Sequence, residues 1–380
     1  MITIVGGKIL SALGQGSQKI DALRTGRPRV GTIEVTAIDE QLTYPYYRID
    51  GTPRLAHPSI VDTYLDRAVN GLLKNLTLKP SDLSNIGLFL GSSSIDYSLV
   101  RPIEQEIDNG HAATCKRERV GGGNYLDNLM ERFAFKGPAL TYNTACTSSA
   151  NGLLDAASML EGGIIDHALV LGLELYSPTT LEGFSLMQLL SPEVARPFDQ
   201  NRNGMVLGEA VSAVLLCRDD IIPSPWRYLG GKSNCETYSV TGADPSGDGI
   251  AQVMREALED AGTMKNTITA VKAHGTASEL LDLAEMRAME QLFEPVPPYF
   301  SLKGYIGHTL GGCGVAELVL TMESIDAGFI PPAVYFKTLD TKFSKAPVQE
   351  VMVVQSGRFM LNYFGFGGNN TSFVIEKTTT

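Results

Sequence analysis

The sequence predicts an α/β protein made of two packed halves or domains. Short apolar runs rich in Ile, Val and Leu alternate with longer segments of helical spacing, which is typical of buried strands with helices packed on the sheet faces. The composition agrees, because 43% of residues are hydrophobic, 19% are charged, and 39 glycines and 19 prolines indicate many turns. A chain of 380 residues exceeds the size at which a single core closes.

The elements follow from the spacing of apolar residues. The predicted strands are residues 85–91, 166–176, 212–218, 270–275, 351–356 and 371–377. The predicted helices are residues 59–76, 147–163, 250–263, 280–293 and 314–328, and several end at glycine, as helices commonly do.

A polar, proline-containing segment at residues 217–228 separates two stretches of similar size. We therefore divide the chain into an N-terminal half, residues 1–220, and a C-terminal half, residues 221–380. Each half contains a strand that runs into a small polar loop, which suggests a duplicated unit. Residues 95–140 are polar and irregular, so we expect them to be an excursion from the sheet.

Charge and cysteine content exclude several classes of protein. A net charge of −11 and a pI near 5.0 argue against general affinity for nucleic acid or an anionic membrane. The 5 cysteines lack paired spacing, so we expect no disulfide framework, no zinc site and a reducing, cytoplasmic location. The start does not resemble a signal peptide, and no apolar run is long enough to span a bilayer. No nucleotide-binding or metal-ligand motif occurs, so we expect no organic cofactor and no metal site, and only a bound alkali ion stays open.

Cys146 lies among small residues in "NTACTSSANG", between a β-capable segment and a helical pattern. This places its sulfur near a helix N-terminus, where the dipole is expected to lower the thiol pKa from about 8.5 toward neutrality. The alternative is a buried structural cysteine, which is the commoner role of a lone cysteine.

Two of the 5 histidines lie in glycine- and threonine-rich loops. His274 ends a predicted strand in "AHGTAS", where sites of α/β proteins gather, and His308 lies between glycines in "KGYIGHTLGGCG". Either histidine alone can be a satisfied core residue. A cysteine with two histidines in such loops favours an enzyme with a thioester-forming nucleophile.

Five ordered motifs resemble those of the β-ketoacyl-acyl carrier protein synthases, condensing enzymes of the thiolase superfamily. They are "NTACTSSANG", "RPFDQNRNGMVLGEA", "AHGTAS", "KGYIGHTLGGCG" and "FGFGGNNTSFVIEK". The resemblance implies a five-layered α-β-α-β-α fold from two duplicated halves, a homodimer or a heterodimer with a homologous ketosynthase or chain length factor, and a partner acyl carrier protein that carries the phosphopantetheine.

The resemblance also implies a role for each matching residue. They are the nucleophile Cys146, the catalytic His274, His308 and Lys303, the supporting Glu285, Thr276 and Ser278, and the acyl-pocket gate Phe366. The backbone N–H groups of Cys146 and Phe366 are the candidates for an oxyanion hole, and neutral His274 and His308 can hold the charge of an enolate. Lys303 can bias local charge, or it can simply pair with Glu285.

Each residue outside the catalytic set has two possible interpretations. An acyl tunnel can be lined by Phe184, Leu186, Met187 and Leu189, of which Phe184 and Met187 are our candidates. The alternative is that these residues are ordinary core. Arg196 and Arg202 can bind an acidic carrier or pair with Asp199 and Glu209. Lys116, Arg117 and Arg119 are either a docking patch or a solvated face.

Some positions depart from the family pattern. Ser278 and Leu281 replace a threonine and a glycine after His274, and "GGCG" follows His308 where alanines are usual. We therefore expect a specialised enzyme that condenses a Cys-bound acyl chain with a malonyl-carrier thioester in fatty acid, polyketide or polyene synthesis. The alternatives are a chain-length-factor-like subunit, which usually lacks the cysteine, and a thiolase or starter-unit synthase, which usually lacks the second histidine or adds another cysteine.

Overall fold

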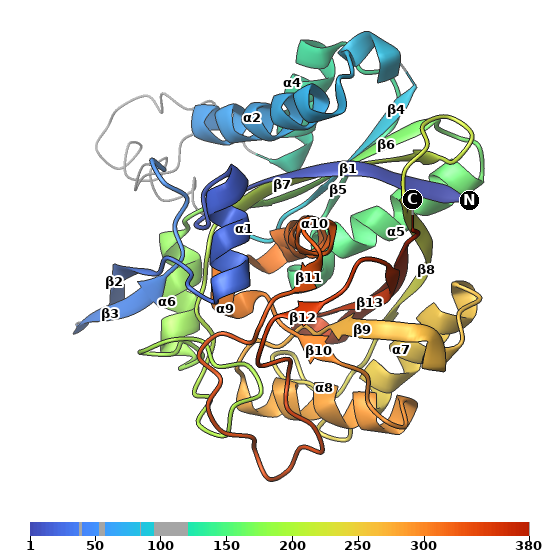
Figure 1. Ribbon diagram of the computed structural model, residues 1–380. Coiled ribbons are helices and arrows are strands. Elements are labelled where there is room, and N and C mark those ends of the chain that lie inside the picture. Colours follow the sequence, from blue (N-terminus) through green and yellow to red (C-terminus); the bar gives the residue numbers. More distant parts are fainter. Residues whose placement is uncertain (38–39, 53–57, 84, 95–120, 380) are drawn as a thin grey trace, which may run out of the picture.

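The computed structural model describes residues 1–380 except 38–39, 53–57, 84, 95–120 and 380 (Figure 1). A 10-stranded sheet runs through the described part of the chain. Its first-half strands are β1 (Ile2–Ser11), β4 (Ile86–Gly91), β5 (Ala139–Tyr142), β6 (His167–Glu174) and β7 (Ala210–Arg218). Its second-half strands are β8 (Trp226–Cys235), β9 (Ile268–Lys272), β10 (Tyr299–Phe300), β13 (Gly357–Phe364) and β14 (Asn369–Lys377).

The strand order repeats between the halves. The first half reads β1-β7-β6-β4-β5 and the second reads β8-β14-β13-β9-β10. The directions repeat as well, because in each half the first three strands pair antiparallel and the last three pair parallel. The halves join where β1 pairs with β8. The duplication expected from the sequence is therefore present in the topology.

Helices form the other layers (Figure 1). They are α2 (Pro58–Leu76) and α4 (Gly122–Phe133) on the outside of the first half, α5 (Ser148–Glu161) and α10 (Cys313–Asp326) in the middle, and α7 (Asp248–Asp260) and α8 (Glu279–Leu292) on the outside of the second half. The middle helix α10 is buried on nearly every side, whereas the outer helix α7 buries one apolar stripe. The structure is thus the five-layered α-β-α-β-α fold that the resemblance implies.

The remaining elements lie around this scaffold. They are α1 (Gly16–Thr25), the hairpin of β2 (Gly31–Ala37) and β3 (Glu40–Tyr46), α6 (Pro178–Leu186), α9 (Lys303–Ile306), and the small pair β11 (Phe329–Ile330) and β12 (Met352–Val353). The hairpin packs on α6, and the hydroxyls of Tyr44 and Ser185 are 3.0 Å apart.

The structure confirms the five predicted helices within a few residues and corrects two other expectations. Only β12, at Met352–Val353, forms within residues 351–356, and the long strand β13 follows it instead. Residues 95–140 were expected to leave the sheet, yet α4 buries one face and β5 is an edge strand of the sheet. The expectation was therefore wrong for residues 122–140, and residues 95–120 lie outside the described residues.

Over the part of the chain that the structure describes, no helix combines the length and the apolar character that crossing a membrane requires.

We expect Gly314→Val to destabilise the fold, because α5 and α10 approach closely at this residue. A Cβ atom on Gly314 lies 2.4 Å from the backbone nitrogen of Ala150, so the two helices must move apart. Overpacking of this kind costs about 1–3 kcal/mol or more. The measurement is the midpoint of urea unfolding. Gly183→Ala in α6 is the control, because a Cβ there meets nothing within 4 Å, and equal stability of both variants would contradict the close contact.

Candidate active site

Cys146 lies in a single 3₁₀ turn, Ala145–Thr147, directly before α5. Ala145 has a φ of 52°, a left-handed conformation that costs energy in any residue other than glycine. Local hydrogen bonds hold this turn, since the Ser148 hydroxyl donates to the Ala145 carbonyl at 2.6 Å and accepts from the Thr144 N–H at 3.0 Å. The strained turn fixes the thiol at the end of the central helix.

His274 follows β9 and is fixed through its own backbone. The carboxylate of Glu285 in α8 accepts hydrogen bonds from the N–H groups of His274 and Gly275 at 2.8 and 2.9 Å. Asp282 accepts from the Thr276 N–H at 3.0 Å. The "HGT" loop is therefore held by two buried carboxylates of α8, which is where the structure places the supporting residue Glu285.

His308 follows α9 and is tied to the first half of the chain. Its N–H donates to the Val206 carbonyl at 2.7 Å, and its carbonyl accepts from the Gly208 N–H at 3.1 Å. The His308 side chain points at Cys146, with Nε2 3.1 Å from Sγ.

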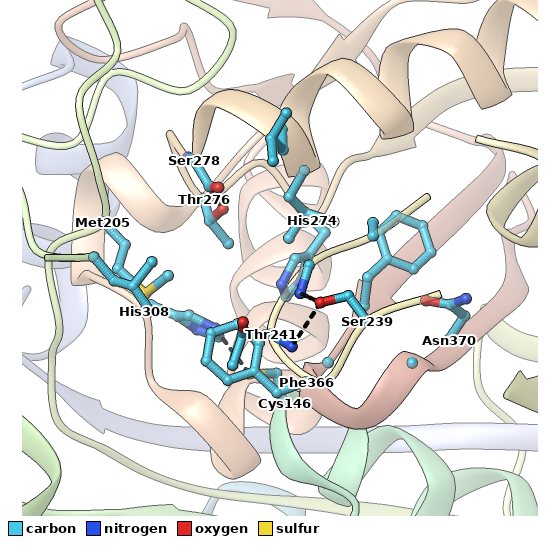
Figure 2. Close-up of a pocket in the computed structure, with 18 of the residues that line it drawn as sticks. Cys146, Met205, Ser239, Thr241, His274, Thr276, Ser278, His308, Phe366 and Asn370 are labelled. Atoms are coloured by element: carbon cyan, nitrogen blue, oxygen red, sulfur yellow. Dashed lines mark hydrogen bonds between the residues drawn. The ribbon is translucent and has the colours of Figure 1, made fainter. Parts of the chain in front are cut away.

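The three residues predicted from separate motifs meet in one place (Figure 2). The ring centroids of His274 and His308 are 5.2 Å apart and the rings are nearly perpendicular. Cys146, His274 and His308 are 7%, 1% and 2% exposed. Within the described residues, Nδ1 of each of the two rings has no hydrogen-bond partner.

Burial controls the ionisation of the thiol. It raises the pKa of the Cys146 thiol to about 12, although the Lys303 ammonium and the Phe366 N–H each act to lower it. The expectation that the helix N-terminus brings this pKa toward neutrality was therefore wrong. The thiol is protonated at neutral pH, so its attack on a carbonyl requires a base to accept the proton.

Burial also keeps both imidazoles neutral. It lowers the pKa of His274 well below its usual range, and the charges of Lys303 and Lys272 lower that pKa further, as a protonated His308 also does. It has the same effect on His308, with Lys303 and Lys272 as the additional causes. A neutral imidazole can accept a proton at one nitrogen and donate one from the other.

Lys303 has a different partner from the one considered from the sequence. Its ammonium binds Glu317 of α10, while Glu285 is occupied by the backbone of the "HGT" loop. A second buried lysine, Lys272, binds the other oxygen of Glu317 at 2.5 Å. Neither Glu317 nor Lys272 was predicted from the sequence. The signal was a charged residue within an apolar run, because Lys272 is the only charged residue of β9 and Glu317 is the only one among residues 313–322 of α10.

The "FGFGG" loop closes over the turn that carries Cys146. Gly365 comes so near that a Cβ on it lies 3.0 Å from the backbone nitrogen of Cys146, so a side chain there would crowd the turn. The Phe366 N–H is directed at the Cys146 thiol. The two backbone N–H groups named as oxyanion-hole candidates are therefore neighbours of the same sulfur.

A cavity of about 270 Å³ reaches Cys146, His274 and His308. Thr276, Ser278, Phe184 and Phe366 also line it. The rings of Phe184 and Phe366 stack with centroids 5.7 Å apart. Met187 does not line this cavity. It follows the end of α6 and is 45% exposed, so the structure does not place it with Phe184.

The basic residues considered for carrier binding are engaged elsewhere. Arg202 is buried and donates to Asp340 at 2.8 Å, and Arg196 pairs with Glu193 at 2.5 Å. The expectation that these arginines pair with the carboxylates of Asp199 and Glu209 was therefore wrong. Lys116, Arg117 and Arg119 lie outside the described residues.

No group of at least three His, Cys, Asp or Glu side chains is arranged to hold a metal ion within the described ranges.

Comparison with known proteins agrees with this geometry. Family models of the "Beta-ketoacyl synthase, N-terminal domain" and the "Beta-ketoacyl synthase, C-terminal domain" match residues 60–220 and 227–337. The duplicated fold is thiolase-like. The chain belongs to the β-ketoacyl synthase family.

One sequence relative and two solved structures illustrate the similarity. A chloroplastic 3-oxoacyl-[acyl-carrier-protein] synthase II of Arabidopsis thaliana is 31% identical over 76% of this chain and 56% of its own length. The ketosynthase–chain length factor complex ApeO–ApeC of Xenorhabdus doucetiae contains a chain with 25% identity and a TM-score of 0.86, over 99% of this chain and 98% of that one. A Burkholderia phymatum β-ketoacyl synthase has the same fold, with 24% identity and a TM-score of 0.87 over 100% and 99% of the two chains. The match spans 55% to 64% of four curated relatives.

Alkylation of Cys146 by iodoacetamide is expected to keep accelerating above pH 9. The raised pKa of the thiol leaves little thiolate at neutral pH, and the thiolate is the reactive form. The measurement is peptide mass spectrometry of labelled protein between pH 6 and about pH 10, with urea-unfolded protein as the control, since an ordinary thiol has a pKa of about 8.5. A plateau below about pH 8 in the folded protein would show that the thiol is activated at rest.

Proposed function

We propose that this chain is an elongating β-ketoacyl-acyl carrier protein synthase, with Cys146, His274, His308 and Lys303 as its catalytic residues. The observation that carries the proposal is the 3.1 Å contact between His308 Nε2 and Cys146 Sγ, with His274 beside it in the same cavity. This arrangement supplies a nucleophile, a base within reach and a second hydrogen-bond donor.

In the first step the acyl chain moves from a carrier thioester to Cys146. The thiol passes its proton to His308 Nε2 as sulfur attacks the carbonyl carbon, and the N–H groups of Cys146 and Phe366 bind the resulting oxyanion. The bond to the carrier sulfur then breaks, and the carrier thiolate takes the proton from His308. The acyl group remains on Cys146 and the carrier leaves as a thiol.

In the second step a malonyl-carrier thioester enters. Its bond to the carboxylate carbon breaks, carbon dioxide leaves, and the electron pair forms an enolate. The enolate oxygen accepts hydrogen bonds from neutral His274 and from neutral His308, which after acylation of Cys146 carries its proton on Nε2. The enolate carbon attacks the acyl carbonyl, a carbon–carbon bond forms, and the bond to Cys146 breaks. The released thiolate takes one proton from solvent, the proton that the decarboxylative condensation consumes overall, and the product is a β-ketoacyl thioester on the carrier.

The cavity suggests how the carrier's arm and the acyl chain are bound. Thr276 and Ser278 line the cavity and offer hydroxyls to a phosphopantetheine arm. This arm belongs to the acyl carrier protein. In our proposal the chain itself therefore has no resident cofactor. Phe184 and Phe366 stack beside Cys146 and gate the space for the acyl chain.

The assembly and location are part of the same proposal. The chain pairs with itself or with a homologous chain-length-factor subunit, as in the ApeO–ApeC complex. It works in the cytoplasm, where its cysteines stay reduced. The repeated strand order supports a division into halves 1–220 and 221–380, with Cys146 in the first and both histidines in the second.

The alternative function is that of a chain-length-factor-like subunit, which fold similarity to ketosynthase–chain length factor complexes also suggests. An intact Cys146 in contact with His308 favours the catalyst, because a subunit without catalysis has no need of the thiol.

Cys146→Ala is expected to abolish both the acyl adduct and the β-ketoacyl product. The measurement is intact-mass spectrometry after incubation with a series of acyl-carrier thioesters, followed by malonyl-carrier protein. Cys217→Ala is the matched control, because Cys217 is a buried cysteine at the end of β7 that does not line the cavity. Full complex activity of Cys146→Ala with a homologous partner would instead identify the chain as the accessory subunit.

His274→Ala and His308→Ala are expected to separate the two steps. Loss of His308 slows acylation and condensation, since its Nε2 contacts the thiol, whereas loss of His274 spares acylation and lowers condensation by about 10²–10⁴-fold. Single-turnover acylation and product formation are measured separately. Equal loss of acylation in the two variants would contradict this division of roles.

A further inference from the structure

A second buried ammonium lies behind the histidines. Lys272 is the last residue of β9, two positions before His274, and it is 0% exposed. Its Nζ donates to Glu317 at 2.5 Å and to the backbone carbonyl of Asn362 at 2.7 Å, and it lies 3.7 Å from the centroid of the Tyr363 ring.

Lys272 and Lys303 share the single carboxylate of Glu317. Lys272 binds one oxygen and Lys303 binds the other, and all three side chains are at most 1% exposed. When both lysines are protonated, two ammonium groups and one carboxylate leave one positive charge in this cluster. Burial lowers the pKa of Lys272, and the Glu317 carboxylate acts to raise it. A further buried carboxylate, Glu285, interacts with the charge of Lys272, while its oxygens accept hydrogen bonds from the N–H groups of His274 and Gly275.

A second buried ammonium on one carboxylate is costly, because removing an ammonium from water costs several kcal/mol. The pair of Lys303 and Glu317 would be neutral without Lys272, so the fold does not need the second ammonium to satisfy this carboxylate. A second carboxylate of α10 shows the contrast: Glu323 pairs with Lys19 of α1 at 2.5 Å, and Glu323 is 27% exposed. The shared carboxylate therefore indicates a role beyond stability.

We propose that Lys272 is a positioning residue whose ammonium serves as a built-in monovalent cation, fixing Glu317 and Lys303 and favouring negative charge at the reacting atoms. It occupies a site made of a carboxylate oxygen and a carbonyl oxygen over an aromatic face, which are ligands suited to a single positive charge. This inference rests on the condensing activity proposed above, in which a thiolate, an oxyanion and an enolate all carry negative charge.

The charged groups around Lys272 come from several elements. Glu317 and Cys313 face it from α10, Lys303 from α9 and Glu285 from α8, and its charge lowers the pKa of His274 and of Glu285. Removal of this charge therefore moves the pKa of His274 upward toward its usual range. The proposed reaction requires a neutral imidazole. As the solution is acidified, a variant without this charge therefore loses activity at a higher pH than the unchanged protein does.

Lys272→Met and Lys272→Gln test the proposal, and Gln keeps a hydrogen-bond donor without the charge. The rate of condensation is expected to fall about 10- to 100-fold, the size of effect that a unit charge has on a nearby buried group. The acid limb of the pH–rate profile is expected to move to higher pH, and added methylammonium or K⁺ is expected to restore activity to Lys272→Ala. Lys19→Gln is the matched control, with no shift of the acid limb.

A readout independent of turnover separates this proposal from the proposed function. The pKa of His274 is followed by NMR of histidine-labelled protein, in which only 5 residues titrate, and it is expected to rise in Lys272→Gln. An unchanged His274 pKa together with an unmoved acid limb overturns the role of Lys272. A shifted His274 pKa in a protein that forms no Cys146 adduct supports the charge effect and counts against the condensing activity alone. If Lys272→Met does not fold, Lys272→Gln decides by the same two readouts.

Discussion

The crossing of α5 and α10 in the middle layer is the contact on which the site depends. Gly314 permits the close approach to Ala150, and the Cys313 thiol donates to the Cys146 carbonyl at 3.0 Å. Each helix begins directly after the loop that carries a reacting group, Cys146 before α5 and His308 before α10. Because the two halves repeat one topology, these loops are equivalent positions, and the crossing brings Cys146 and His308 into contact.

Much of this arrangement can be predicted from the sequence, but the short or glycine-rich strands and the partners of buried side chains cannot. The helices are long and periodic, and Cys146, His274 and His308 stand out because reactive residue types lie in loops of small residues. Strand β8 carries "LGGKSN" and β10 has only two residues, so neither shows a strand pattern. The partner of Lys303 depends on how α10 packs, and that long-range contact is absent from any local motif.

The ionisation of Cys146 shows which effect dominates when two physical arguments conflict. The dipole of a helix N-terminus is worth about 0.3–1 kcal/mol, and up to about 2 kcal/mol in a partly buried site. Burial raises the thiol pKa to about 12, and a rise of roughly three units corresponds to about 4 kcal/mol. Desolvation therefore prevails, and the thiol keeps its proton at neutral pH, which is why the proposed reaction uses His308 as a base.

The same burial gives the site a consistent electrostatic character. The thiol is protonated and both imidazoles are neutral, so the three groups nearest the thiol carry no charge before a thioester enters. Behind the cavity, two ammonium groups share Glu317. Every charged species that the proposed reaction forms at carbon, oxygen or sulfur is negative. In the proposed reaction, neutral hydrogen-bond donors backed by a fixed, desolvated cation stabilise each of these negative species while the side chains of the site keep their positions. One cavity can therefore support both chemical steps.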